Sequence, residues 1–461
     1  IRFMPGGEVI ESAGFAETPL AWQLAFNKAD DAWDFDRGVV TLGRDVLQPA
    51  ETRGLHVRGN TDTVRLDDWL NLSRSGEKKV GAADRIRSIE LDIADLYAIG
   101  QHVEGHRVRV DRNARDWVVQ VTGEELSGSI FVPYDFDSGR EMVIEMERMR
   151  LPGNDSASDE PSTLDPRELP PITVTAADFA LGKRSFGALD ARIERVANGL
   201  SATSITTRDD SFDINLTGRW VVDEADPLGS RTFATGTLMS RDVMRSMNRL
   251  DFEPGIVSDA MTADFDVNWS GGPRAEFLNV LDGDVRVRFG DGQLEEVEPG
   301  AGRVFGLMSI VALPRRLSLD FSDVFNKGFG FDKIAGTFRI DDGQTYTCDL
   351  SLEGPAADIG IVGRTGLNNR DYDQVAVVSA NVGNTLPIVG AVVAGPQVAA
   401  ALLVFSQIFK KPLQEVGQVY YAISGSWDEP TIEGSDSRSF AEHGAMAGCI
   451  ENVGTGQAER N

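Results

Sequence analysis

Strict alternation of apolar and polar residues runs through much of this chain and restricts what it can fold into. Segments such as 22–26, 89–93, 106–110 and 284–289 place apolar side chains at alternate positions, with mostly polar or charged residues between them. Successive side chains on a β-strand point to opposite faces of a sheet, so each segment predicts a strand with one apolar and one polar face. Few helical segments are available to cover the apolar faces. The sequence therefore predicts a mainly β protein with a few short helices.

The strand-rich pattern starts again at several points along the chain. Block 89–96 resembles 172–179, and block 59–70 resembles 236–244. These weak similarities indicate a repeated unit of several strands with an occasional short helix. The predicted fold is an elongated, curved antiparallel sheet, repeat-like, whose apolar face forms an open hydrophobic groove. The alternative is a closed core, in which a second sheet covers that face.

Changes in composition divide the chain into regions. We expect a β-rich groove segment at 1–151, a polar linker or loop at 152–171, a second groove segment at 172–282 and a C-terminal region at 283–433. The tail at 434–461 has little apolar pattern and is predicted to be disordered. Residue 1 falls inside an expected strand, with no initiator Met or signal peptide, so we expect a fragment of a longer protein.

One long stretch, 386–409, carries no charge although the chain has a net charge of −27. Pro396 interrupts it but suits the start of a helix that ends near Lys411. Such a helix is about 24 Å long, short of the roughly 30 Å hydrocarbon core of a bilayer. We predict an apolar helical element at 386–411 that caps the structure, dips into a bilayer, or does both; the alternative is a buried helix that closes the core. The candidate membrane-contact residues are Leu386, Ile388, Val389, Val392, Val398, Leu402, Leu403, Phe405 and Phe409.

Candidate groove-lining residues follow from the alternation in the C-terminal region. A register error of one residue would invert their facing. They are Val285, Val287, Phe289, Phe338, Ile340, Leu350, Leu352, Val375 and Val377.

Charge and cysteine content exclude several classes of protein. The isoelectric point near 4.5 argues against nucleic acid as a partner, because its phosphates would be repelled. The two cysteines, Cys348 and Cys449, lie far apart in unlike contexts, and we expect no disulfide framework and no metal cluster from them.

The remaining motifs do not build a catalytic or cofactor site. His102 and His106 flank Glu104, but Gly105 and the strand pattern argue against the helix that would turn both imidazoles toward one metal. The GxGxxxG run at 300–306 lacks the surrounding βαβ pattern of a dinucleotide site. Acid pairs at 67–68 and 341–342 suit helix caps and turns. We predict no enzyme, no cofactor and no metal.

Several short motifs carry a resemblance to a known family. They are EPGAGR at 298–303, LPRRL at 313–317, EGPAAD at 353–358, LPIVG at 386–390 and YAISGSW at 421–427. The region 283–432 resembles the C-terminal part of the YhdP family of AsmA-like proteins, relatives of TamB. Upstream, DPRELPP at 165–171 and the alternating strands are similar to the central region of that family.

The resemblance implies a protein of the Gram-negative periplasm, anchored to the inner membrane by an N-terminal helix that this chain lacks. It implies a bridge that moves phospholipid toward the outer membrane and supports its permeability barrier. The implied partners are phospholipids, the outer-membrane surface at the C-terminal end and other envelope proteins, and the family has no catalytic residues. The second hypothesis is a non-enzymatic envelope scaffold with a closed β core.

Overall fold

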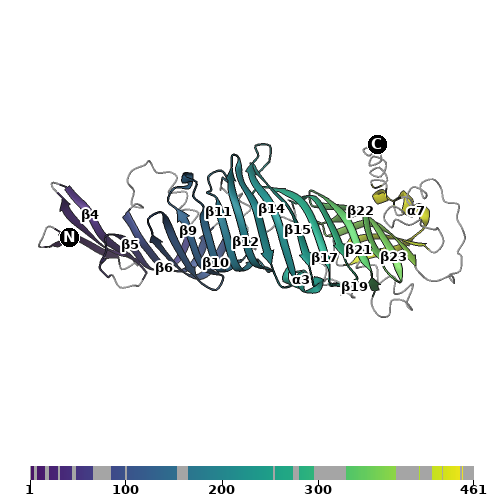
Figure 1. Cartoon of the computed structure of the whole chain (residues 1–461), viewed down its shortest axis with the longest axis horizontal. Helices are drawn as coiled ribbons and strands as arrows, with labels where there is room; N and C mark the ends of the chain where they lie inside the picture. Colours follow the sequence, from purple (N-terminus) through teal and green to yellow (C-terminus); the bar gives the residue numbers. More distant parts are fainter. Residues whose placement is uncertain are drawn as a thin grey trace. The chain divides into compact units, whose positions relative to one another are not determined.

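The computed structural model describes most of the residues of the chain. These are 2–4, 8–15, 20–29, 32–43, 48–65, 85–98, 101–152, 165–252, 255–273, 280–294, 329–380, 404, 418–427, 429–446 and 449. They fall into two compact units, Ile1–Thr203 and Ser204–Asn461, and the division lies inside strand β13 (Gly199–Arg208). Both units are ladders of β-strands (Figure 1), so the predicted mainly β fold is confirmed.

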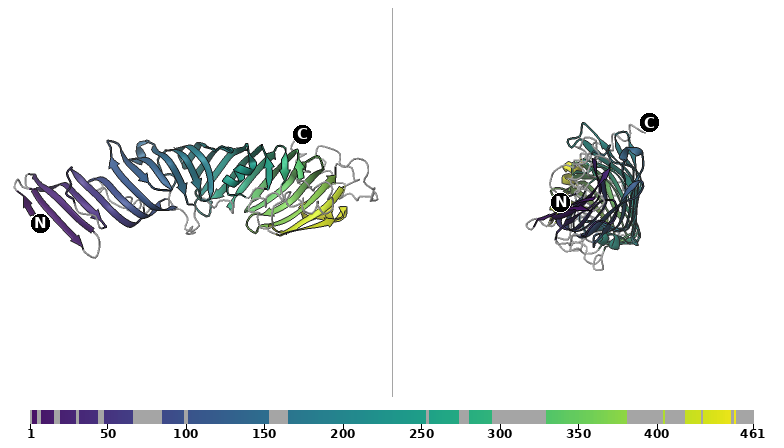
Figure 2. Two further views of the ribbon diagram at one scale, coloured as in Figure 1. Left: turned by 90° about the horizontal axis from the view of Figure 1, so that it is seen from below. Right: turned by 90° about the vertical axis from the view of Figure 1, so that its left-hand side faces the viewer.

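In the first unit, each strand pairs with the next one along the chain, and the colours in Figure 2 follow this order. The strands are β1 (Arg2–Met4), β2 (Glu8–Phe15), β3 (Leu20–Ala29), β4 (Ala32–Leu42), β5 (Gly54–Arg65), β6 (Ile86–Ala98), β7 (Gln101–Arg112), β8 (Asp116–Thr122), β9 (Leu126–Pro133), β10 (Met142–Leu151), β11 (Ile172–Leu181) and β12 (Arg184–Val196). A short 3₁₀ helix, η1 (Phe136–Ser138), follows β9.

Most of these pairs are antiparallel, as predicted, but β4–β5, β5–β6 and β10–β11 are parallel. A parallel pair needs a connection long enough to return the chain to the edge where the first strand began. Between β10 and β11 that connection contains the predicted polar linker. Met142 is the register partner of Ile172 and Leu151 that of Leu181, so the linker joins two neighbouring strands of one unit.

In the second unit, the main ladder is antiparallel throughout. Its strands are β14 (Phe212–Val222), β15 (Ser230–Ser240), β17 (Met261–Ser270), β18 (Asp282–Phe289), β21 (Lys333–Asp341), β22 (Gln344–Glu353), β23 (Ala357–Gly366), β24 (Asp371–Ala380), β25 (Gln418–Ser426) and β26 (Pro430–Ser435). A separate small sheet contains β16 (Ile256–Ser258), β19 (Gly292–Leu294) and β20 (Phe329–Phe331).

Local sequence signals explain two features of this unit. The β21–β22 hairpin turns at Asp342 and Gly343, whose φ angles of 46° and 68° suit the two-residue turn predicted at 341–343. Helix α3 (Val243–Arg249) begins after Asp242, whose carboxylate accepts the backbone N–H of Arg245 at 3.0 Å. Its buried face joins the small sheet in one apolar cluster.

Apolar side chains are buried on both faces of the ladder at its C-terminal end. The larger cluster lies on one face and includes Leu350, Ile361 and Tyr421. The smaller cluster on the other face includes Val362, Val375, Val377 and Tyr420, covered by Val404 and by residues of the tail.

Two predictions about the C-terminal end are corrected by the structure. Residues 436–446 of the tail, predicted to be disordered, contain helix α7 (Ser437–Glu442), whose N-cap Asp436 accepts two backbone N–H groups. Phe440 of this helix is buried against Tyr420. The cysteines, predicted to form no disulfide, are bonded to each other as Cys348–Cys449. Sequence spacing gave no indication of this bond because the strands between the two cysteines fold back on themselves.

Removing the disulfide should destabilise the second unit. The bond closes a loop with a sequence separation of 101 residues, and a loop of about 100 residues corresponds to about 4.7 kcal/mol in the chain-entropy model. We expect the double variant Cys348→Ser, Cys449→Ser to unfold at a clearly lower urea concentration than the wild type. Reductant should lower the wild-type midpoint similarly and leave the double variant unchanged. A wild-type midpoint that ignores reductant would contradict this expectation.

Candidate functional site

One face of the first unit's sheet is apolar on strand after strand. Its residues lie two positions apart along each strand, and register pairs each with a residue of the next strand. Adjacent strands lie about 4.8 Å apart, so ten aligned positions extend over roughly 43 Å. The first apolar row consists of Trp22, Val40, Val57, Ile89, Val110, Val119, Ile130, Ile144, Val174 and Ala191.

A second row runs beside the first and is also free of charge. It consists of Leu20, Leu42, Gly59, Leu91, Val108, Val121, Gly128, Met146, Ala176 and Leu189. Gly59 has a φ of 125°, and a Cβ there would lie 2.0 Å from the Leu42 carbonyl oxygen, so only glycine fits. We call the surface formed by the two rows the row face.

On the opposite face of the same strands, the row that lies between the two apolar rows is polar. Shifting the register by one residue gives Arg58, Glu90, Arg109, Gln120, Ser129, Glu145, Thr175 and Asp190 in line. Most of these side chains are exposed, and the others are half-buried. The polar face therefore keeps the unit hydrated and leaves the row face as its apolar surface.

The row face of the first unit is partly open to water. Most of its residues, Val57, Ile89, Val110 and Ile130 among them, are only half-buried. A sheet face covered by a second layer would bury them. The exposure of these residues therefore favours an open apolar face over the closed-core alternative in this part of the chain.

In the second unit, the exposure of the apolar side chains that are register partners decreases along the ladder. Ile214, Leu238, Ala263 and Val287 are register partners on β14, β15, β17 and β18, and all are half-buried. On β22–β25 the corresponding partners are Leu350, Ile361, Ala376 and Tyr421, which are between 0% and 1% exposed. The ladder thus presents an accessible apolar surface at β14–β18 and a packed core at β22–β25.

Polar side chains interrupt the apolar surface inside the sealed end. Thr347 and Gln374 lie in the row that continues from Val285 and Phe338. Gln374 is fully buried, and its Nε2 donates to Thr365 Oγ1 at 2.8 Å. The row that runs from β14 is therefore interrupted by a polar side chain within the packed core.

Comparison with known proteins identifies the family of this chain. The family model described as YhdP protein matches residues 10–432. The chain belongs to the YhdP family. The match covers most of both strand ladders and ends shortly before α7, so the disulfide partner Cys449 lies beyond it.

One curated relative in this family is the intermembrane phospholipid transporter YhdP of Escherichia coli (strain K12). It is 26% identical over 407 residues, which cover 86% of this chain and 32% of the relative. The chain thus spans about a third of the length of that YhdP protein. No solved structure is significantly similar to the chain.

The structure divides the predicted lining residues between two faces. Val375 and Val377 lie on the face under α7, opposite to the others. In the β24 sequence, residues 375–378 are all apolar, so alternation carries no information on facing there. The residues that share one face of the second unit's ladder are Val285, Val287, Phe289, Phe338, Ile340, Leu350 and Leu352. Of these, Val285 and Val287 are half-buried and the rest are buried.

The candidate membrane-contact residues all lie outside the described part of the chain. Within 386–411 only Val404 is described, and it is 3% exposed in the cluster with Val375 and Phe440. Among the described helices, none combines the length and the apolar character needed to cross a membrane.

The two histidines of the 102–106 segment point to opposite faces. In the pairing of β6 with β7, Ala94 and Gly105 are not register partners. At this irregularity the side chains of both strands change faces, so His102 and His106 do not share a face as residues four apart on a regular strand would. His106 is on the row face and 1% exposed, and its Nε2 accepts the backbone N–H of Leu126 at 3.1 Å. Burial lowers the pKa of the His106 imidazole below its ordinary value of 6.5, while the Glu125 carboxylate, 3.7 Å from Nε2, opposes this shift.

The lowered pKa of His106 predicts loss of stability in acid. Unfolding restores the ordinary pKa, so below about pH 6.5 the unfolded chain binds a proton that the folded chain does not. This contribution to stability is complete above that pH and falls as the pH drops toward the folded-state pKa; the pKa of His56 is also lowered by burial. We expect the urea midpoint of the first unit to fall between about pH 7.5 and 5.5, and to fall less in His106→Gln. Equal losses in wild type and variant would contradict the assignment to His106.

Proposed function

We propose that this chain is part of a bridge that carries phospholipid across the periplasm of a Gram-negative bacterium, from the inner toward the outer membrane. The observation that carries the proposal is the pair of in-register apolar rows, half-buried over the first unit and over β14–β18. Membership of a family that includes a named intermembrane phospholipid transporter supports it.

The physical task of such a bridge is to keep acyl chains away from water. Each methylene removed from water is worth about 0.8 kcal/mol, so a chain of about 16 carbons costs roughly 13 kcal/mol to expose. A face that offers uncharged, mostly aliphatic side chains on successive strands offsets this cost at each step. Because the hydrophobic effect is non-directional, a uniform lining gives the lipid no fixed stopping point.

The charged face of the sheet suits the opposite requirement. Its Arg, Glu and Asp side chains keep the polar side of the ladder in water while the row face holds the ligand. Transfer along such a surface breaks no covalent bond, so the proposed function is non-enzymatic and uses no cofactor.

The disulfide supports the proposed location. Cys348–Cys449 joins the tail to β22, and such bonds persist in oxidising compartments such as the bacterial periplasm. Anchoring by an upstream inner-membrane helix and contact with envelope proteins remain part of the proposal.

A scaffold role is the second candidate, and the sealed end favours it locally. Leu350, Leu352 and Ile359 are 0% exposed, as in an ordinary closed core. We therefore assign lipid binding to the first unit and to β14–β18, and assign β21–β26 to closing the ladder.

A matched pair of double variants tests the lipid-binding face. Val119→Asp with Ile130→Asp places two carboxylates on the row face, where both side chains are half-buried; Gln120→Asp with Ser129→Asp places the same charges on the polar face of the same strands. We expect phospholipid co-purifying with the full chain from a Gram-negative host, measured by native mass spectrometry, to fall at least tenfold in the first variant only.

Circular dichroism and urea unfolding provide the control for folding. Two folded variants that retain equal lipid would exclude the row face as the binding surface. Loss of the fold in the row-face variant alone would favour the scaffold candidate, with a closed core in place of the groove.

We also propose that the uncharged stretch 386–409 contacts a membrane surface. Replacing Ile388 and Val392 by Asp places charges in the stretch while leaving the buried Val404 unchanged. We expect flotation of the full chain with phospholipid vesicles to fall severalfold. A control with Asp at the charged-face positions Arg58 and Arg109 should float like the wild type on vesicles of uncharged lipid. Unchanged flotation of the 388/392 variant would remove the membrane role.

A further inference from the structure

A break in the charge pairing between β6 and β7 identifies an additional site in the first unit. On the polar face of these strands, acids lie opposite bases: Glu90 is the register partner of Arg109, and Asp92 that of Arg107. The Arg107 guanidinium donates to both Asp92 oxygens, at 2.7 and 3.2 Å. Three residues beyond this pair, two acids lie opposite each other instead.

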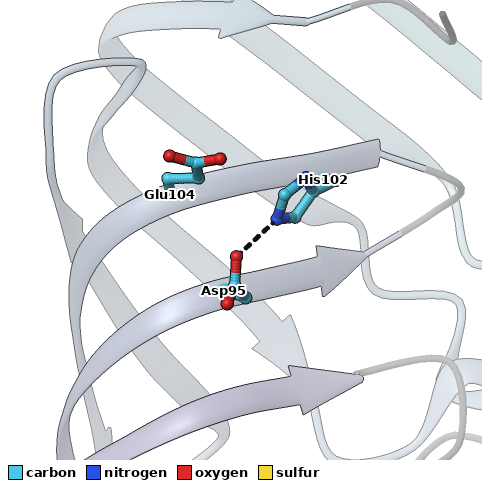
Figure 3. Close-up of side chains that lie close together, drawn as sticks. All are labelled: Asp95, His102 and Glu104. Carbon is cyan, nitrogen blue, oxygen red and sulfur yellow. Dashed lines mark hydrogen bonds and ion pairs between the residues drawn. The ribbon is translucent and has the colours of Figure 1, made fainter. Parts of the chain in front are cut away.

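Asp95 is the register partner of another acid, Glu104. Like charges directly opposite each other on neighbouring strands are destabilising, and a bound cation would relieve this repulsion. His102 lies beside it, with its Nε2 2.8 Å from Asp95 Oδ1 (Figure 3). One imidazole and two carboxylates thus converge on the same small surface.

The imidazole is held in place by stacked rings. The register aligns Arg65, Tyr97 and His102 on β5, β6 and β7. The Tyr97 and His102 rings are stacked, with centroids 4.4 Å apart and planes inclined by 13°. The Arg65 guanidinium carbon lies 4.5 Å from the Tyr97 centroid. This stack fixes the ring orientation of His102 and so orients its Nε2 toward the carboxylates.

We propose that Asp95, His102 and Glu104 bind a divalent transition-metal ion, for which Zn²⁺ is the natural probe. One potential ligand atom from each residue lies within 4.8 Å of the other two. A single ion with bonds of about 2.0 to 2.2 Å can therefore contact all three after small side-chain movements. An imidazole nitrogen with two carboxylates suits Zn²⁺ better than Ca²⁺ or Mg²⁺, which prefer oxygen ligands alone.

The bound ion would replace a repulsive acid pair with three coordinate bonds. Asp95 is on β6, and His102 and Glu104 are on β7, so the ion crosslinks the strands near their hairpin end. The three side chains are exposed or half-buried, which leaves the remaining coordination positions to water. The proposal concerns the polar face and is independent of lipid binding on the row face.

Zinc titration of the purified full chain by isothermal calorimetry tests the proposal. We expect one Zn²⁺ per chain in the wild type and affinity at least tenfold weaker in His102→Gln and in Glu104→Gln. Co²⁺ should give a visible ligand-field absorption band in the wild type that both variants lose. This second measurement reports coordination directly.

Two control variants separate the site from general attraction of cations to an acidic protein. Asp92→Asn removes an acid from the same face of β6, and His443→Gln removes a histidine that lies beside an acid, Asp373, at 3.5 Å. Both should bind Zn²⁺ like the wild type. Equal weakening in Asp92→Asn and His102→Gln, or no one-site binding in the wild type, would overturn the proposal and leave the cluster as a surface ion pair.

Discussion

Main-chain hydrogen bonding between neighbouring strands is the constraint on which the other properties of this molecule depend. Each strand alternates apolar and polar side chains, but alternation alone produces only isolated two-faced strands. Register joins the strands, because it places Val110 beside Val119 and Ile130 beside Ile144. A slip of one residue in a single strand would exchange its apolar row positions for residues of the other face, most of which are polar or charged. The continuity of the row face is therefore a property of the whole ladder.

Within each unit, the exposure of the apolar side chains distinguishes two kinds of surface. In the first unit, most side chains of the two rows are half-buried, as at Ile89 and Val110. Where α3, the small sheet and the strands β21–β25 come together, Ile334 and Leu350 are completely buried. The same residue types thus provide a binding surface in one region and a stabilising core in another. Burial, more than composition, separates the two roles.

Sequence reasoning was sufficient for the strands and for one hairpin turn, because both signals are local. The alternation at 284–289 and the turn at 341–343 each depend on a few adjacent residues. The prediction of which sheet face each side chain occupies failed at β24, because residues 375–378 are apolar at every position. The parallel pairs, the disulfide and the Asp95–His102–Glu104 cluster depend on residues that only the ladder brings together. Helix α7 could have been predicted from the sequence, since the N-cap residue Asp436 precedes the apolar Phe440 and Ala441 at helical spacing.

The disulfide also has a mechanical consequence. Cys348 and Cys449 enclose β23, β24, β25, β26 and α7 in a covalent ring. A force applied to the two ends of the chain is transmitted through the disulfide and bypasses the residues between the two cysteines, which are 101 positions apart in the sequence. Fully extended, that segment would measure about 340 Å. This length stays hidden from an applied force while the bond is intact, so a protein stretched between two attachment points would keep its C-terminal strands folded under tension.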